Sequence, residues 1–235
     1  MMEHTVRAFD RELELLGLKI SEMGGLAEKM LSESIEALIQ LNVEAARSII
    51  TTDSRLDTLQ REIEEEAVHI IARRQPLGAD LREIIGAMRI SGDLERIGDL
   101  TKNIAKRTLN LAKEHRLPRA TIGLRHMGQI CAMQLKEVLD AYSHGDVKRT
   151  VQVWQRDAEI DALEDSVFRE LLTFMLEDPR HISPCTHLLF CSKNIERAGD
   201  HATNIAETVH YIVTGNKLPI ERPKTTQDNL WIADR

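Results

Sequence analysis

A segment near the middle of this 235-residue chain returns 101 residues further on. When LERIGDLTKNIA at 94–105 is aligned with IERAGDHATNIA at 195–206, seven of the twelve positions are identical. Identity this dense at a fixed offset indicates a duplicated unit, so we expect the chain to fold as two copies of one motif. The identical residues are mostly polar, which packing alone does not require. They therefore point to function as well as to fold.

Both copies are expected to be helical. Aromatic residues make up only 3% of the chain, whereas Leu, Ile, Ala, Glu and Arg, which favour helices, are abundant. Turn signals containing Gly and Pro, such as QPLG at 75–78, interrupt the periodic segments. These breaks predict six long helices, at about 5–41, 43–74, 79–114, 119–142, 146–176 and 183–215.

The apolar stripes of these helices group them into two bundles. The third and sixth helices carry apolar residues in the same phase at an offset of 101, and the second and fifth do so at an offset of 104. Heptad-like stripes on long helices are typical of nearly antiparallel bundles. We therefore predict an all-α fold, a tandem repeat of two three-helix bundles. They should span 5–116 and 117–215, followed by a flexible tail over 216–235.

The composition argues against several classes of protein. The net charge of −7, with Lys and Arg spread along the chain, disfavours a nucleic-acid binder. Three cysteines without CxxC spacing are typical of free thiols in a reducing compartment. Neither a secretory signal nor a membrane-spanning stretch is found, so we expect a cytoplasmic protein. No GxxxxGK[ST] loop, GxSxG elbow or Cys–His grouping is present, so we expect no catalytic site.

Each copy carries two pairs of carboxylates, and the members of a pair are four residues apart. Residues at this spacing share one face of a helix, where like charges cost a few tenths of a kcal/mol unless a cation offsets them. The pairs are Asp53/Asp57 and Glu95/Asp99 in the first copy, and Asp157/Asp161 and Glu196/Asp200 in the second.

The two pairs of each copy are expected to face each other. In the first copy both lie about 20 residues from the turn at Pro76, or about 30 Å along each helix of an antiparallel hairpin. The second copy repeats the arrangement across Pro179 to within about one turn. Four carboxylates that converge without a basic partner form an oxygen-rich site for Mg²⁺, Ca²⁺, Mn²⁺ or iron.

A solvated acidic face is the alternative interpretation of these pairs, with Arg96, Lys102 and Arg197 balancing the charge. Gly98 and Gly199 favour a special role, because a glycine inside a helix costs about 1 kcal/mol and usually has a packing or access reason.

A second alternative is a ferritin-like di-iron oxidase or metal-storage bundle. Such bundles use Glu-x-x-His on two helices together with a Glu on two others. This chain contains Glu66-x-x-His69 and Glu207-x-x-His210. The duplication keeps neither histidine, and the two motifs fall in different halves, which disfavours this interpretation.

These residues resemble the PhoU family. ERIGD at 95–99 and ERAGD at 196–200 occur together with IIARRQPLGADLR at 70–82 and MGG at 23–25, and the resemblance extends over residues 5–215. It implies two similar three-helix bundles and E(D)xxxD metal motifs, which bind multinuclear iron or zinc in some members and Mg²⁺ or Mn²⁺ in others. The motifs fall on the eight carboxylates named above.

The resemblance also implies a function. PhoU-like proteins are negative regulators of phosphate-starvation signalling and high-affinity phosphate uptake. They are thought to link the ATPase of the phosphate-specific transporter to a membrane sensor histidine kinase, and many form homodimers. We therefore expect a non-enzymatic adaptor that reaches the membrane only through these partner proteins.

Overall fold

Seven α-helices and one short 3₁₀ helix make up the computed structural model, which describes residues 2–114 and 121–219. The elements are α1 (Met2–Gln40), α2 (Val43–Arg74), α3 (Gly78–Leu111), α4 (Thr121–His144), α5 (Val147–Gln155), α6 (Asp157–Glu177), η1 (Pro179–His181) and α7 (Ile182–Thr214). No strand occurs in the described ranges, which confirms the predicted all-α fold. None of the described helices has the length and apolarity needed to cross a membrane.

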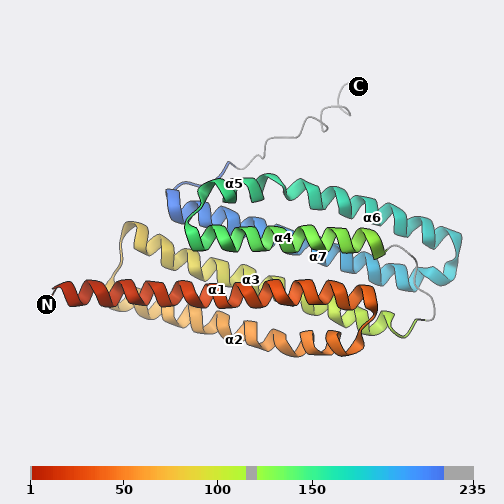
Figure 1. The fold of residues 1–235 in the computed structure, drawn as a ribbon, viewed down its shortest axis with the longest axis horizontal. Helices are drawn as coiled ribbons and strands as arrows, with labels where there is room; N and C mark the ends of the chain where they lie inside the picture. Colours follow the sequence, from red (N-terminus) through yellow and green to blue (C-terminus); the bar gives the residue numbers. More distant parts are fainter. Residues whose placement is uncertain (1, 115–120, 220–235) are drawn as a thin grey trace, which may run out of the picture.

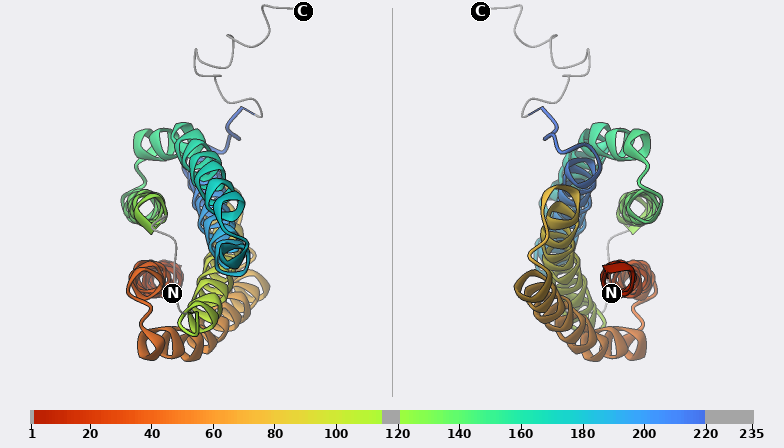
Figure 2. Two further views of the ribbon diagram at one scale, coloured as in Figure 1. Left: turned by 90° about the vertical axis from the view of Figure 1, so that its right-hand side faces the viewer. Right: turned by 90° about the vertical axis from the view of Figure 1, so that its left-hand side faces the viewer.

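The helices form two bundles that pack side by side (Figure 1). One contains α1, α2 and α3, and the other contains α4, α5, α6 and α7. The bundles meet where α3 packs on α7 and α1 packs on α4, as the end-on views in Figure 2 show. The predicted boundary at 116–117 and the predicted tail from residue 220 onward lie outside the described residues.

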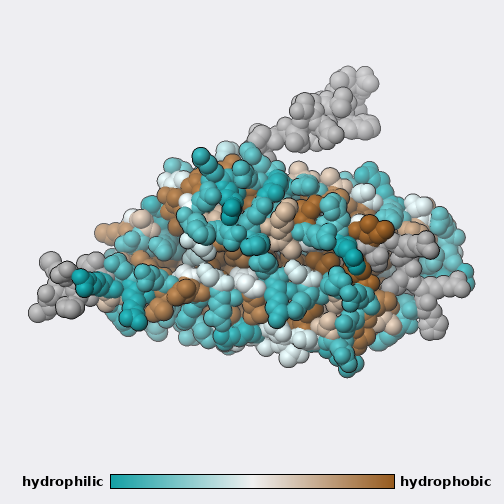
Figure 3. All heavy atoms as spheres, viewed as in Figure 1, coloured by the Kyte–Doolittle hydropathy of each residue, from teal (hydrophilic) through white to brown (hydrophobic). Residues whose placement is uncertain are grey.

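A single apolar core runs through both bundles. Buried aliphatic residues from all seven α-helices belong to one cluster, with Ile97 and Ile104 of α3 and Ile195 and Ile205 of α7 among its fully enclosed members. Hydrophilic residues cover most of the face in Figure 3, and hydrophobic residues appear among them in smaller patches. The contact between the bundles is therefore built like the interior of one domain.

Reciprocal glycine contacts join α1 to α4. Gly24 of α1 lies against Leu139 of α4, and Gly128 of α4 lies against Ile35 of α1. Each residue of the second contact is the counterpart, at an offset of 104, of one in the first. Because the same contact occurs twice with the roles exchanged, the repeats are related by a pseudo-twofold axis through this interface.

Gly98 and Gly199 have the packing role that their position inside helices predicts. A Cβ on Gly199 would lie 2.7 Å from the Cδ1 atom of Ile160, and one on Gly98 would approach Leu56 Cδ1 to less than 3.0 Å. Each glycine thus lets the helix that carries Glu-x-x-x-Asp approach its hairpin partner closely. The approach occurs at the level of the carboxylates, since the Cβ of an alanine at 98 would lie 3.5 Å from Asp53 Oδ1.

Substituting Gly98 tests this close approach. Gly98→Ala gains about 1 kcal/mol of helix propensity but overpacks against the fully buried Leu56, which typically costs about 1–3 kcal/mol. Gly92→Ala on the same helix is the matched control, because no atom lies within 4 Å of its Cβ position. We expect urea unfolding to show the control as the more stable variant by about 2 kcal/mol. If the two variants had equal free energies of unfolding, the side chain of Leu56 would move aside without a measurable loss of stability.

The middle helix of the second bundle differs from the prediction. The sequence predicts one helix over 146–176, but the structure divides it at Arg156 into α5 and α6. The Arg156 N–H donates to the Val153 carbonyl at 3.1 Å, a tight turn, and buried Gln134 donates its amide to the Arg156 carbonyl at 3.2 Å. Met30, the counterpart of Gln134 in α1, offers no such donor. The break places Asp157 in the first turn of α6, where the helix dipole favours a carboxylate.

Candidate metal centre

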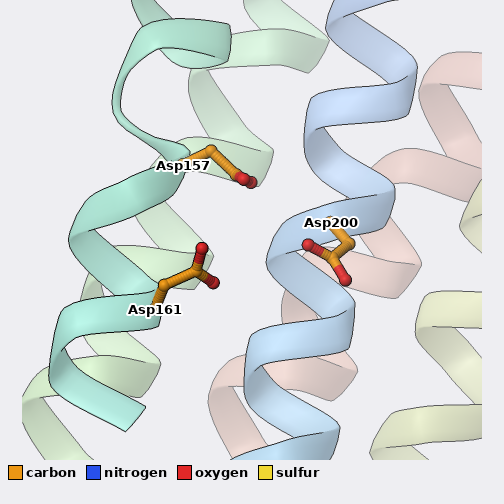
Figure 4. Close-up of side chains that lie close together, drawn as sticks. All are labelled: Asp157, Asp161 and Asp200. Carbon is orange, nitrogen blue, oxygen red and sulfur yellow. The ribbon is translucent and has the colours of Figure 1, made fainter. Parts of the chain in front are cut away.

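Three of the predicted carboxylates converge in the second bundle. Asp157 and Asp161 point from α6 toward α7, where Asp200 faces them (Figure 4). One oxygen from each residue can be chosen so that all three lie within 4.8 Å of one another. Because the α6/α7 hairpin is antiparallel and tightly packed at Gly199, residues about 40 positions apart share one site. Three converging carboxylate oxygens suit a hard cation.

The three carboxylates of this second cluster differ in environment. Asp157 is 4% exposed and accepts a hydrogen bond of 2.8 Å from the Thr203 hydroxyl. Asp161 and Asp200 are exposed at the surface. Partial desolvation of its carboxyl group by the surrounding protein, together with the charges of Glu196, Asp157 and Asp161, raises the pKa of Asp200 to about 6. The cluster therefore concentrates negative charge that a bound cation would relieve.

Glu196, the fourth predicted ligand of the second cluster, lies one turn before Asp200. Its Oε1 atom accepts a hydrogen bond of 2.8 Å from Lys193. Its Oε2 atom is buried and has no hydrogen-bond partner among the described residues. A buried carboxylate oxygen without a partner is costly, so this atom is a natural additional ligand or an acceptor for metal-bound water.

Glu164 is an acidic neighbour of the second cluster that the repeat pattern did not single out. Burial raises its pKa, as do the neighbouring charges of Glu196, Asp165 and Asp161, while Lys193 opposes them. Its position three residues after Asp161, on the same face of α6, was the available signal. The repeat comparison hid it, because its counterpart in α2 is the uncharged Gln60.

The first cluster contains a cation of its own. Lys102 of α3 donates hydrogen bonds to Asp53 of α2 and, at 2.7 Å, to Asp99 of α3. The expectation that these carboxylates converge without a basic partner is therefore wrong for the first bundle. Arg96 also lies 3.6 Å from Glu95 and 3.7 Å from Asp99, as the alternative of a charge-balanced acidic face predicts.

The pKa shifts in the first cluster follow from this geometry. Burial opposes the charge of Lys102, but its bonds to Asp53 and Asp99 outweigh burial and raise its pKa. Burial raises the pKa of Asp53 despite Lys102, and the charges of Asp57 and Asp99 add to the rise. Burial likewise raises the pKa of Glu95, and Asp99, Asp57 and Asp53 contribute to this rise. All four predicted carboxylates thus interact, and Lys102 is shared between two of them.

One substitution between the repeats accounts for much of this difference. Thr203 stands 101 residues after Lys102, at the equivalent position of α7. The ammonium group of Lys102 bridges Asp53 and Asp99, whereas the Thr203 hydroxyl donates only to Asp157. In the second cluster Lys193 binds Glu196, and the oxygens of Asp157, Asp161 and Asp200 fit a metal ion, whereas Lys102 bridges two carboxylates of the first cluster.

The two Glu-x-x-His motifs do not come together. The motif at 66–69 lies on α2 and that at 207–210 lies on α7, and these helices do not pack against each other. Glu66 lies 3.7 Å from the ammonium of Lys19, and Glu207 accepts a hydrogen bond of 3.2 Å from Trp154. The geometry of the described helices therefore gives no di-iron site at these residues.

Asp200 is expected to make the stability of the metal-free protein depend on pH. Its folded pKa of about 6 exceeds the usual 3.8, so between these values the folded state binds more protons than the unfolded chain. The free energy of unfolding should therefore rise as the pH falls from about 7 through 6 toward 4. Asp200→Asn should remove this contribution and stabilise the protein near pH 7 more than near pH 4.

Urea unfolding in the presence of a chelator, repeated across this pH range, measures the effect. Glu65→Gln, which removes an exposed acid on α2, is the control and should follow the parent curve. A parent and an Asp200→Asn variant with the same pH dependence would contradict the assignment of this shift to Asp200.

Comparison with known proteins places this arrangement in a family. The PhoU domain matches the chain twice, over residues 20–108 and 124–209. The phosphate-specific transport system accessory protein PhoU homolog of Rhizobium meliloti (strain 1021) is 52% identical over 221 residues, which cover 94% of this chain and 93% of that protein. The corresponding homolog of Caulobacter vibrioides (strain NA1000 / CB15N) is 47% identical over 224 residues, with coverages of 95% and 97%.

Solved structures share the fold. The crystal structure of PhoU from Pseudomonas aeruginosa superposes with a TM-score of 0.86 at 39% identity, covering 88% of this chain and all of that one. The phosphate transport system regulatory protein PhoU from Streptococcus pneumoniae gives a TM-score of 0.83 at 29% identity, covering 90% of this chain and 100% of that one. With two matched repeats, relatives over nearly its whole length and this shared fold, the chain belongs to the PhoU family.

Proposed function

We propose that this chain is a cytoplasmic, non-enzymatic regulator of phosphate-specific transport that binds metal at its carboxylate clusters. The observation that carries the metal proposal is the convergence of Asp157, Asp161 and Asp200. These three side chains supply oxygen ligands only, which favours Mg²⁺, Mn²⁺ or iron over the nitrogen and sulfur ligands that zinc usually takes. Glu196 is the fourth ligand, through the buried oxygen that lacks a hydrogen-bond partner among the described residues.

The first cluster is proposed as a conditional site. Asp53, Asp57, Glu95 and Asp99 offer the same oxygen atoms, but Lys102 must leave before a metal ion can bind there. Displacing Lys102 breaks two charge-assisted hydrogen bonds, so the affinity of the first cluster is lower than that of the second. One tightly bound ion per chain is the expected stoichiometry at moderate metal concentration.

The regulatory part of the proposal rests on the relatives. They are named accessory or regulatory proteins of phosphate transport, and this chain covers more than nine-tenths of the Rhizobium and Caulobacter homologs. We propose that the chain lowers phosphate-starvation signalling and high-affinity uptake through contacts with the transporter ATPase and a sensor histidine kinase, acting as a homodimer. Asp161 and Asp200 lie at the surface, where a bound metal can contribute to a partner contact.

Direct binding to these two partners tests the regulatory proposal. The full chain would be immobilised and exposed to the purified transporter ATPase and to the cytoplasmic part of the histidine kinase, at high and low phosphate. We expect both to be retained more strongly at high phosphate. We expect Asp161→Asn with Asp200→Asn to weaken retention and Glu65→Gln to leave it unchanged. Failure to retain either partner at both phosphate levels would refute the adaptor role.

A further inference from the structure

A groove of about 610 Å³ lies at the contact between the two bundles, where α1, α3, α4 and α7 meet. It is lined by one face of α1 around Gly17, by Glu83 near the start of α3, by Tyr142 at the end of α4, and by Ile212 and Val213 in the last turns of α7. It shares no residue with either carboxylate cluster. Its size is in the range of ligand-binding clefts.

The lining of the groove is largely apolar and partly exposed. Leu18 on its α1 side is 65% exposed, and Val213 on its α7 side is 44% exposed. Ile212, which also lines the groove, is half-buried. Isolated exposed aliphatic residues need no explanation, but several gathered around one concavity are typical of a binding surface.

The groove lies beside α1 at the level where α4 ends. Helix α4 ends at His144 and the chain turns away at Gly145, whose φ is +63°, whereas α1 continues past this point toward its N-terminus (Figure 1). The α1 residues that line the groove, 13–21, span about 12 Å or two helical turns. The nearest atom to a Cβ placed on Gly17 is the Tyr142 hydroxyl at 3.9 Å, so there is room for a side chain next to α1 at this position.

An unpaired carboxylate lies within this apolar surface. Glu83 is half-buried, and no cationic side chain of the described residues pairs with it, whereas Glu12 on α1 is bound by Arg73 and Arg74. Burial and the nearby Asp80 raise the pKa of Glu83. Burial and Glu83 together raise the pKa of Tyr142. Such a carboxylate is complementary to an ammonium or guanidinium group brought in by a ligand.

We propose that this groove binds a short amphipathic helix of a partner protein, which packs apolar side chains against Leu18, Ile212 and Val213 and directs a Lys or Arg to Glu83. Helices and the turn at Gly145 form the walls of the groove, so there is no open sheet edge to which an extended peptide could add a strand. A helix laid in a helical groove presents its contacts at i, i+3, i+4 and i+7. The proposal does not depend on metal, and a chelator should leave this binding unchanged.

Three synthetic helical peptides of about 14 residues test the proposal. The three peptides share one Leu-rich face and differ only in the residue at the centre of that face, which is Lys, Gln or Glu. Their dissociation constants for the full chain are measured by fluorescence anisotropy. We expect the Lys peptide to bind about tenfold more tightly than the Glu peptide, with the Gln peptide between them. Glu83→Gln should reduce the preference for Lys over Gln to about twofold or less.

Matched glycine substitutions locate the site. Gly17→Leu fills the groove and should weaken the Lys peptide about tenfold or more, whereas Gly25→Leu on the same helix, with no atom within 4 Å of its Cβ position, should leave affinity unchanged. Circular dichroism checks that each variant is folded. Two peptide results would overturn the proposal: no binding of the Lys peptide, or a preference that Glu83→Gln leaves intact.

Two other occupants of the groove would equally refute the partner helix. Analytical ultracentrifugation tests whether the chain associates with itself. Self-association that Gly17→Leu abolishes and Gly25→Leu preserves would assign the groove to a second copy. Binding of free butylamine as tight as that of the Lys peptide would assign it to a small cation. A partner helix requires that neither be observed.

Discussion

Replacing Lys102 with Met is expected to lower the free energy of unfolding of the metal-free protein by about 2–3 kcal/mol. Removing one partner of a buried ion pair typically costs about 3–5 kcal/mol because the other charge stays buried, and Lys102 is 22% exposed, which lessens the cost. The residue left behind is Asp53, which is 4% exposed and lies beside Asp57 and Asp99. Urea unfolding in the presence of a chelator measures the loss.

The same substitution is expected to create a metal site in the first bundle. Without the ammonium group, four carboxylates of the first cluster lack the cation that binds two of them, and a divalent ion can take its place. Added Mg²⁺ or Mn²⁺ should therefore restore most of the lost stability, since a ligand that binds only the folded state stabilises it. Calorimetric titration should show one more bound ion per chain than in the parent protein.

Lys106→Met is the matched control for Lys102→Met. Lys106 lies one turn further along α3, is exposed, and its loss should change stability by no more than about 0.5 kcal/mol. It should also leave the metal stoichiometry unchanged. If Lys102→Met behaved like Lys106→Met in both measurements, Lys102 would have no role as the internal cation of the first cluster.

Replacing Asp161 and Asp200 together with Asn should weaken metal binding by the second cluster more than 100-fold. Changing residues that only orient metal ligands costs about 10–100-fold in affinity, and these two are proposed as ligands themselves. The metal-free double variant should be at least as stable as the parent near pH 7, because partial desolvation and repulsion among the carboxylates raise the pKa of Asp200, and the substitution relieves both. Competition with a chelating dye gives the affinity.

The equivalent change in the first bundle, Asp57→Asn with Asp99→Asn, is the internal control. It should alter tight metal binding little, because Lys102 already binds Asp53 and Asp99 in that cluster, and it should lower stability because Lys102 loses its bond to Asp99. A loss of metal affinity as large as that of the second-cluster variant would show that the two clusters bind metal alike. An unchanged affinity in the second-cluster variant would remove Asp161 and Asp200 from the site.

Divergence between the repeats gives the fold its functional asymmetry. The pseudo-twofold axis through Gly24 and Gly128 places the two hairpins in equivalent settings. Lys102 in one and Thr203 in the other change the charge balance of the two clusters. A duplicated scaffold can thus place a lysine between two carboxylates of one cluster and leave the matching oxygens of the other cluster to converge on each other.

The arrangement of the helices and the height of the carboxylates were predictable from the sequence. The Pro-containing turns at Pro76 and Pro179 set the hairpins, and a constant rise per residue converts sequence distance from the turn into height along the helix. Helical periodicity likewise placed both members of each pair on one face. These features depend on local geometry, which repeats identically along a helix.

Other features depend on side chains that meet only after packing. Lys102 lies three residues from Asp99, yet its bond to Asp53 joins residues 49 positions apart, and the sequence does not state which way its flexible stem turns. The break at Arg156 depends on the Gln134 amide from another helix. The groove beside Glu83 exists because α4 stops while α1 continues, a relation between elements that no local pattern encodes.

The sequence by itself determined a duplicated all-helical chain and the eight carboxylates that face one another in two hairpins, because repeat identity and helical rise are local properties. Only the tertiary structure decided that the first cluster contains the Lys102 ammonium and that Asp157, Asp161 and Asp200 converge in the second. Charge neutralisation acts over a few ångströms in space. It is therefore settled by the packing of side chains from different helices and not by their spacing along the chain.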